Sequence, residues 1–296
     1  MRRPHRFLTL LIGAALVAPA SVASLNTASA ATTGPTLVGI RAAHHPGYDR
    51  VVFDFVGGLP STRSVGYVSR LIADPSDLPV QIGGRAILKV TMRGTNAHND
   101  AGHSTAPARL AFALPNVMNV VRSGDFEAVT SYGIGLARRE TVKVFTLRNP
   151  SRVVIDIRAA FPTVMKKVWL FNQGRYLANT QPFYTPVWRP VQPFTPATGV
   201  MDRIFAGPLP AEYAAGLRSL LSRATGFSNL TVSGGTARVR LTGGCSAGGS
   251  TVSVAGEIIP SLKQFPTVRQ VKIYDPSGHT LQPAGPVDSI PYCLEP

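Results

Sequence analysis

The first half of the chain alternates apolar and polar residues with the period of a β-strand. In residues 51–55 the odd positions are apolar and Asp54 points to the other face, and in residues 86–93 the even positions are apolar. Residues 153–157 alternate in the same way, and turn-forming Gly, Pro, Asn and Asp separate these stretches. Because no apolar pattern of helical period interrupts them, we expect an antiparallel β-sandwich or barrel over residues 37–158.

Two short stretches near the ends of this region share one pattern. Residues 50–55 read RVVFDF and residues 152–157 read RVVIDI. The sequence between them has no period, so the region is not a repeat array. Two strands with similar surroundings would account for the likeness.

Beyond residues 159–163 the pattern changes, because stretches of helical period alternate with strands. Proline follows Thr195 at the first position of one expected helix, and Gly234-Gly235 is typical of a hairpin turn. Pro260 lies within the other expected helix and should kink or interrupt it. In chain order the expected elements are strands at 167–171 and 183–191, a helix from Thr195-Pro196 to Gly207-Pro208, strands at 229–233 and 237–242, a helix at 252–265, and a strand at 268–274.

This order of elements, ββαββαβ, predicts a small α+β domain over residues 164–296, with its helices packed on one mixed sheet. The expected fold class is therefore two domains, an all-β sandwich over residues 37–158 followed by this α+β domain. The linker between them is short, so we expect limited motion of one domain against the other.

The first thirty residues have the order of a secretory signal peptide. Three arginines within the first six residues precede an apolar stretch at residues 7–17, and residues 28–30 read Ala-Ser-Ala. We expect residues 1–30 to be removed by cleavage between Ala30 and Ala31. The mature chain is then secreted and extracytoplasmic, and the apolar stretch of the signal peptide is shorter than a membrane span requires.

The charge of the chain is strongly positive. It has 30 Lys and Arg against 15 Asp and Glu, a formal net charge of +15. Three of these arginines lie in the predicted signal peptide, which leaves +12 for the mature chain. An exported protein does not meet genomic DNA, so anionic wall polymers, acidic lipid headgroups or acidic proteins are better candidate partners. The basic residues are scattered along the sequence, and simple solubility is the alternative.

Cys245 and Cys293 are the two cysteines of the chain. An even count outside the cytoplasm predicts a disulfide. This bond would fasten the C-terminal tail, residues 288–296, to the second domain.

Ser246 is the candidate nucleophile of a hydrolase. Residues 244–248 read GCSAG, which matches G-x-S-x-G between an expected strand and an expected helix, and Asp275 and His279 follow as formal partners. Only 48 residues remain after Gly248, too few for the rest of a hydrolase sheet. A plain Gly/Ser-rich loop is the favoured interpretation.

Histidines supply the candidate metal ligands. His98, Asp100 and His103, together with His44 and His45, are residues that can bind zinc. Their spacing is not that of a recognised ligand set, and a polar surface loop is favoured over a metal site.

Aromatic residues of the second domain offer a third candidate site. Phe183, Tyr184, Trp188 and Phe194 are interleaved with proline and Arg189, and such a set could stack on glycans. Aromatic residues at strand spacing more often pack against the helices of their own domain, so we expect them in the core.

The first domain resembles the AMIN-like domain of bacterial envelope proteins. The resemblance rests on residues 47–55 (GYDRVVFDF), on residues 124–127 (GDFE) with 132–135 (YGIG), and on residues 149–156 (NPSRVVID). It implies a non-catalytic β-sandwich that attaches to the cell envelope, including peptidoglycan.

The second domain resembles the GerMN (sporulation and spore germination) domain. The matching residues are 205–208 (FAGP) with Glu212 and Gly216-Leu217, residues 235–239 (GTARV), and residues 262–268 (LKQFPTV). The resemblance implies an extracytoplasmic protein-interaction domain without known chemistry. The cysteine pair goes beyond the usual pattern of this domain and suggests a stapled variant.

Together these features predict a secreted, cell-wall-associated protein that is not an enzyme and needs no cofactor or metal. The sequence has neither a GxxxxGK[ST] phosphate loop nor an HExxH motif, and Asp125 and Glu127 are typical of solvated acids near a turn. We expect the first domain to bind cell-wall glycopolymer or peptidoglycan. We expect the second to bind an envelope protein, in an envelope assembly or in one linked to sporulation or germination. The alternative is the hydrolase that would use Ser246.

Overall fold

The structure is a computed structural model that describes residues 34–296, which belong to one compact unit. The predicted signal peptide and its cleavage site between Ala30 and Ala31 lie outside the described residues. Within the described part, no helix has the length and hydropathy needed to cross a membrane.

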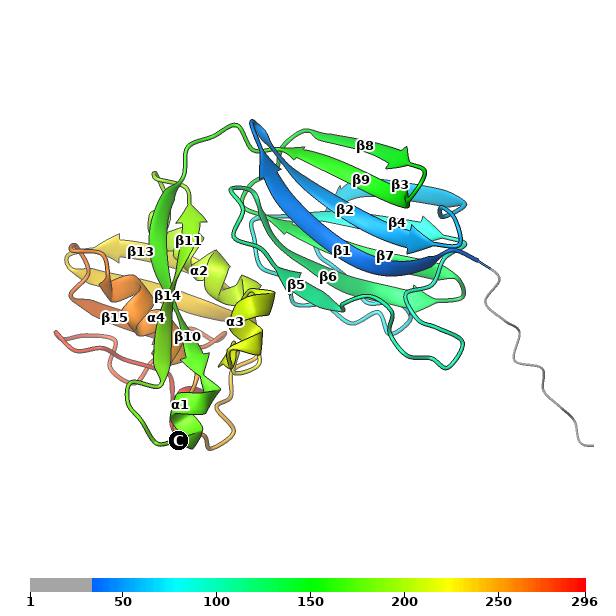
Figure 1. Cartoon of the computed structure of the whole chain (residues 1–296). Helices are drawn as coiled ribbons and strands as arrows, with labels where there is room; N and C mark the ends of the chain where they lie inside the picture. Colours follow the sequence, from blue (N-terminus) through cyan, green and yellow to red (C-terminus); the bar gives the residue numbers. More distant parts are fainter. Residues whose placement is uncertain (1–33) are drawn as a thin grey trace, which may run out of the picture. The chain divides into compact units, whose positions relative to one another are not determined.

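The first domain consists of two antiparallel sheets that lie face to face (Figure 1). The first sheet has the order β1 (Thr36–His45), β2 (Tyr48–Val56), β9 (Ser151–Arg158) and β8 (Val142–Leu147). The second sheet has the order β3 (Thr62–Val68), β4 (Ala86–Arg93), β7 (Val129–Leu136), β6 (Val117–Phe126) and β5 (Arg109–Ala111).

Alternate residues of both sheets form one apolar core, which confirms the predicted strand faces. Phe53 of β2, Val90 of β4 and Ile155 of β9 are fully buried in it. Asp54 lies on the opposite face, as the pattern predicted, and accepts hydrogen bonds from Arg41 of the neighbouring strand. The first domain is therefore a β-sandwich, one of the two architectures that its alternation predicted.

The second domain has two three-stranded sheets, where the sequence predicted one mixed sheet. One sheet has the order β11 (Tyr184–Val191), β10 (Val164–Asn172) and β12 (Leu217–Arg218), and all its pairs are antiparallel. The other has the order β13 (Ala224–Ser233), β14 (Thr236–Gly243) and β15 (Gln270–Tyr274), and β14 pairs with β15 in parallel.

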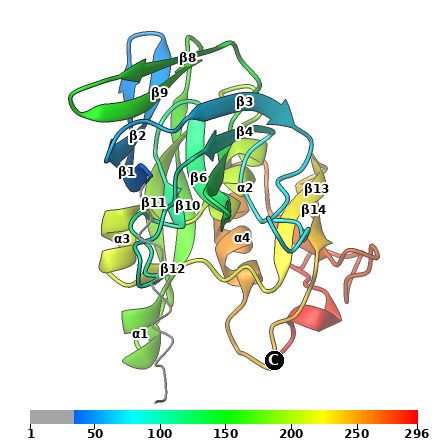
Figure 2. The same cartoon turned by 90° about the vertical axis from the view of Figure 1, so that its right-hand side faces the viewer.

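Two helices pack between these sheets, as Figure 2 shows. α2 (Pro196–Ala206) contacts β10, β11 and β13, and α4 (Val254–Lys263) contacts β10 and β15. Their buried faces, with Ile204 and Ile258, join both sheets in one core. α4 continues through Pro260. The remaining elements are short: α1 (Gln173–Leu177), α3 (Pro210–Ala214) and a 3-10 turn, η1 (Tyr292–Leu294).

α4 also explains why the two sheets stay separate. The side chains of Glu257 and Ser261 in α4, and of Gln264 directly after it, accept hydrogen bonds from backbone N–H groups of β10, at 2.9–3.1 Å. The donors are Phe171, Trp169 and Lys167. Together with the short strand β12, which pairs with Phe171 and Asn172, these bonds occupy the edge of β10 opposite β11, so no strand of the other sheet pairs there.

α2 is also bonded to loops of the first domain. The fully buried guanidinium of Arg203 donates to the carbonyl oxygens of Phe112, at 2.7 Å, and Leu114. Arg85 donates to Asp202 at 3.0 Å. Burial raises the pKa of Asp202 to about 6, and the attraction of Arg85 opposes this rise.

Candidate functional site

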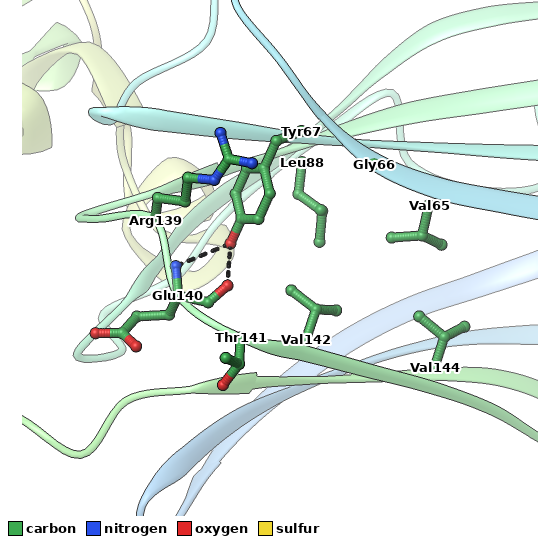
Figure 3. A pocket seen from close by; sticks show the side chains of 9 residues that line it. All are labelled: Val65, Gly66, Tyr67, Leu88, Arg139, Glu140, Thr141, Val142 and Val144. Atoms are coloured by element: carbon green, nitrogen blue, oxygen red, sulfur yellow. Dashed lines mark hydrogen bonds between the residues drawn. The ribbon is translucent and has the colours of Figure 1, made fainter.

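The two sheets of the sandwich leave a groove between β3 and β8. Each of these strands is the edge of its sheet. A hollow of about 520 Å³ lies between them, with Val65 and Leu88 on one side and Val142 and Val144 on the other (Figure 3). The alternation of the two strands turns these apolar side chains inward, so the floor of the groove is an exposed part of the sandwich core.

Tyr67 and the loop before β8 close one end of the groove. The Tyr67 hydroxyl donates to the carbonyl oxygen of Glu140 at 2.6 Å and accepts from its backbone N–H at 3.0 Å (Figure 3). The Arg139 guanidinium lies 4.5 Å from the centre of the Tyr67 ring. Two hydrogen bonds and a cation–π contact thus hold the ring in place at the wall of the groove.

The groove carries positive charge. The carboxylate of Glu140 is already bound by Arg138 at 2.8 Å and by Arg158 at 3.4 Å. Arg63 and Thr62 line a second hollow, of about 490 Å³, which shares Val65 and Val144 with the first. The two hollows make a continuous groove with apolar walls, one aromatic ring and cationic side chains, a surface suited to a sugar polymer that carries negative charge.

The structure gives the hydrolase alternative no support. Within residues 34–296 the Ser246 hydroxyl has one hydrogen-bond partner, the backbone N–H of Gly248 at 3.1 Å, a local turn contact. Asp275 and His279 contact each other, since the His279 backbone N–H donates to the carboxylate at 2.9 Å and its ring nitrogen lies 3.8 Å away, but the Ser246 hydroxyl bonds to neither residue. The residue before Ser246, Cys245, is held in a disulfide.

The candidate zinc ligands are separated along β1. His98 lies near the start of β1, because Asn96, two residues before it, pairs with Thr36 there. His44 lies at the other end of this strand. Eight residues of extended chain span about 26 Å. Within the described residues no group of three or more His, Cys, Asp or Glu side chains could hold a metal ion.

Two of the candidate histidines contact acidic side chains, whereas His45 stacks on the ring of Tyr48. His44 lies 2.7 Å from Asp49, and His98 lies 2.8 Å from Asp125. Asp125 also accepts from the backbone N–H of Ala97 at 2.8 Å and from the Thr130 hydroxyl at 2.9 Å. The prediction that Asp125 is a solvated acid is wrong, because this carboxylate joins the loop at residues 97–98 to the β6–β7 hairpin.

The prediction that all four aromatic residues lie in the core is wrong for two of them. Trp188 is 56% exposed and Phe194 is 91% exposed. Trp188 lies opposite Lys167, on the face of the β10–β11 pair turned away from the helices, and the Lys167 ammonium is 5.4 Å from its ring centre. Tyr184 does pack inward, and burial raises its pKa to about 12.

Arg189, which the sequence placed beside these rings, is buried. Its guanidinium binds both carboxylate oxygens of Glu212 in α3. It therefore belongs to the framework of the second domain and is unavailable to a glycan.

Cys245 and Cys293 are joined in a disulfide with their Cα atoms 5.7 Å apart. The tail that it fastens has further contacts: Leu294 is buried, and the Ala247 N–H donates to the carbonyl oxygen of Cys293 at 2.7 Å.

The sequence did not reveal the groove. β3 reads TRSVGYV, in which only Val65, Tyr67 and Val68 are large and apolar, so its alternation is weak. The one available signal was the pair Arg138-Arg139, which the sequence offered only as part of a scattered positive charge. Pairing β3 with β4 and Tyr67 with the loop before β8 is what brings these residues together.

Comparison with known protein families agrees with both halves of the fold. Residues 35–159 match the AMIN-like domain, and residues 169–275 match the family described as sporulation and spore germination. Searches of curated proteins and of solved structures found no match to the chain. The chain thus carries an AMIN-like domain followed by a sporulation and spore germination domain.

Proposed function

We propose that this chain is an exported, non-catalytic protein of the cell envelope. Its AMIN-like domain holds it on wall polymer, and its second domain binds an envelope protein linked to sporulation or germination. The match to the AMIN-like domain supports the first role, because AMIN-like domains are associated with peptidoglycan-related localisation. The match to the sporulation and spore germination family supports the second role.

The observation that carries the wall-binding proposal is the groove between β3 and β8. Its walls combine the ring of Tyr67 and the apolar side chains of Val65 and Val144 with the cationic groups of Arg63 and Arg139. Apolar sugar faces pack on aromatic rings, and phosphate or carboxylate groups bind guanidinium by charge-assisted hydrogen bonds. An anionic glycopolymer satisfies both demands of this surface.

Two exposed large apolar side chains support a protein contact by the second domain. Trp188 and Met165 lie on the outer face of the β10–β11 pair, and both are more than half exposed. Trp and Met are enriched in protein interfaces, where large apolar side chains supply much of the binding energy. β11 is also an edge strand, so its outer side is open to a partner.

The test of wall binding is co-sedimentation of residues 31–296 with purified sacculi, with and without their anionic polymers, across a salt series. We expect the wild-type protein to pellet, with a component that survives high salt because it rests on apolar contacts. The double variant Arg63→Ser, Arg139→Ser should lose most of the binding at low salt, and Tyr67→Ala should lose the salt-resistant part.

The matched control is the double variant Arg148→Ser, Arg269→Ser, which removes the same charge from exposed positions outside the groove. If both double variants weaken binding equally, the attraction is general and the groove has no role. If the wild-type protein does not pellet at any salt concentration, the wall-binding proposal fails.

A further inference from the structure

A second cleft lies where the turn between α2 and α3 meets β5. Its volume is about 620 Å³, within the range of small-molecule sites. Leu110, Phe205, Pro208 and Leu221 supply an apolar lining, and the ring of Tyr213 stands at the side. This cleft shares no lining residue with the groove between β3 and β8.

Two buried polar atoms in this cleft have no hydrogen-bond partner. The amide nitrogen of Gln81 donates to the carbonyl oxygen of Phe205 at 2.8 Å, but its Oε1 atom is unpartnered. The Oγ atom of Ser219 is also buried and unpartnered. Folded proteins rarely leave such atoms unsatisfied, because each costs about 1–3 kcal/mol. Both residues line the cleft, so a bound molecule could supply the missing bonds.

The charged groups of the cleft have one sign. Arg109 and Arg218 line it, and its lining has no Asp or Glu. Arg109 donates to the carbonyl oxygen of Gln81, and Arg218 donates to those of Tyr213 and Leu217. The Arg218 guanidinium lies 3.9 Å from the centre of the Tyr213 ring, which fixes its plane. A guanidinium has five N–H groups, so each arginine keeps donors for an anion.

We propose that this cleft binds the carboxyl end of a short peptide with an apolar last residue. The apolar side chain lies among Leu110, Phe205 and Pro208. The carboxylate accepts hydrogen bonds from Arg109, Arg218 and the Ser219 hydroxyl, and a peptide N–H donates to the free Oε1 of Gln81. An inorganic anion would leave the apolar walls and Gln81 unused, and a neutral apolar molecule would leave both arginines unused, so a peptide end fits the whole lining.

The test is isothermal titration calorimetry of residues 31–296 with N-acetyl-Ala-Leu and, separately, with its C-terminal amide. We expect the free acid to bind and the amide to bind about tenfold more weakly, since it lacks the charge that the arginines recognise. Arg218→Gln should weaken binding of the acid by a similar factor. Arg139→Gln, which removes one charge from the other groove, should leave it unchanged.

Ser219→Ala is the variant that separates binding from folding. Because the Ser219 hydroxyl has no partner in the free protein, its removal should leave the melting temperature unchanged or raise it. The same change should weaken binding of the acid several-fold. The proposal fails if the acid and the amide bind equally well, or if the acid gives no heat of binding. It also fails if Arg218→Gln and Arg139→Gln have equal effects, or if Ser219→Ala leaves the affinity for the acid unchanged. None of these results depends on whether the protein binds sacculi.

Discussion

Arg50 and Asp156 form a two-point ion pair across the strands β2 and β9. The Arg50 Nε and Nη2 atoms lie 2.6 and 2.8 Å from the two carboxylate oxygens, and the hydrogen bond to Asp156 raises the pKa of Arg50. In the same register Asp54 lies opposite Arg152. The two RVV-containing stretches of the sequence are therefore antiparallel neighbours, and each places its arginine opposite the aspartate of the other.

A double-mutant cycle on this pair should measure a favourable coupling. Arg50→Gln, Asp156→Asn and the double variant should give a coupling of about 1 kcal/mol in the free energy of unfolding, because the contact is bidentate and the side chains are only 31% and 15% exposed. Urea denaturation followed by circular dichroism gives the four values.

The matched control is the pair Arg41–Asp54, which is also bidentate but has side chains 57% and 25% exposed. Solvent should reduce its coupling to at most about 0.5 kcal/mol. Equal couplings for the two pairs would contradict the argument that burial decides the strength.

The sequence predicted the strands of the sandwich and their faces because strict alternation has one simple solution, a sheet with one buried face. It also located α2 and α4, since their apolar residues recur at helical spacing and a proline or glycine marks an end. The likeness of residues 50–55 and 152–157 was visible in the sequence. Their pairing was not, because register between distant strands leaves no local signal.

What the sequence could not predict depends on contacts between distant segments. In the sequence, the polar residues Glu257, Ser261 and Gln264 on and directly after α4 do not indicate that their side chains bind the edge of β10. The exposure of Trp188 follows from its place on the face of the β10–β11 pair that the helices do not cover, and periodicity alone does not show which face that is. The candidate site is even harder to predict from the sequence, because its groove exists only where two edge strands of different sheets come together.

Glu257 should make the protein less stable as the pH rises. Its side chain is fully buried, and burial raises its pKa from 4.5 to about 8, although the N–H groups of Phe171 and Leu220 oppose the rise. Between these pH values the folded protein keeps a proton that the unfolded chain releases. The free energy of unfolding therefore falls with rising pH in this window, by up to about 1.4 kcal/mol per pH unit.

Glu257→Gln should remove this slope, because the amide keeps an acceptor for both N–H groups and does not ionise. Urea denaturation at pH 5, 6, 7 and 8 compares the two proteins. The control Glu127→Gln changes an exposed acid and should keep the wild-type slope. A wild-type slope in Glu257→Gln would show that other groups cause the dependence.

Reduction of the disulfide should loosen the C-terminal tail and destabilise the second domain. The bond joins residues 48 positions apart, so its loss should cost about 4 kcal/mol in the chain-entropy picture. The tail keeps the ion pair of Asp288 with Lys263 and the backbone bonds of Ser289 with Val271 and Ile273. We expect a lower melting temperature on adding dithiothreitol, and faster proteolysis after residue 288.

The double variant Cys245→Ala, Cys293→Ala supplies the comparison for this experiment. It should melt near the temperature of the reduced wild-type protein and should not respond to dithiothreitol. A wild-type protein that melts at the same temperature with and without the reductant would contradict the stabilising role of the bond.

Gly83 should be the residue least able to accept a side chain where α2 meets the first domain. A Cβ atom at this position would lie 2.7 Å from the backbone nitrogen of Ala206 and 2.9 Å from the carbonyl oxygen of Asp202. These are backbone atoms of a helix and cannot turn aside. Gly83→Ala should therefore cost about 1–3 kcal/mol in the free energy of unfolding and speed hydrogen exchange of the α2 amides.

Gly66→Ala is the matched control, because a Cβ atom at Gly66 in β3 would meet no heavy atom within 4 Å. It should leave the free energy of unfolding within about 0.5 kcal/mol of the wild-type value. The contrast separates steric pressure on α2 from the general effect of glycine replacement on the unfolded chain. If hydrogen exchange of the α2 amides were no faster in Gly83→Ala than in Gly66→Ala, then α2 would not depend on close contact with Gly83. The bonds of Arg203 to Phe112 and Leu114 would then be enough to hold the helix against the first domain.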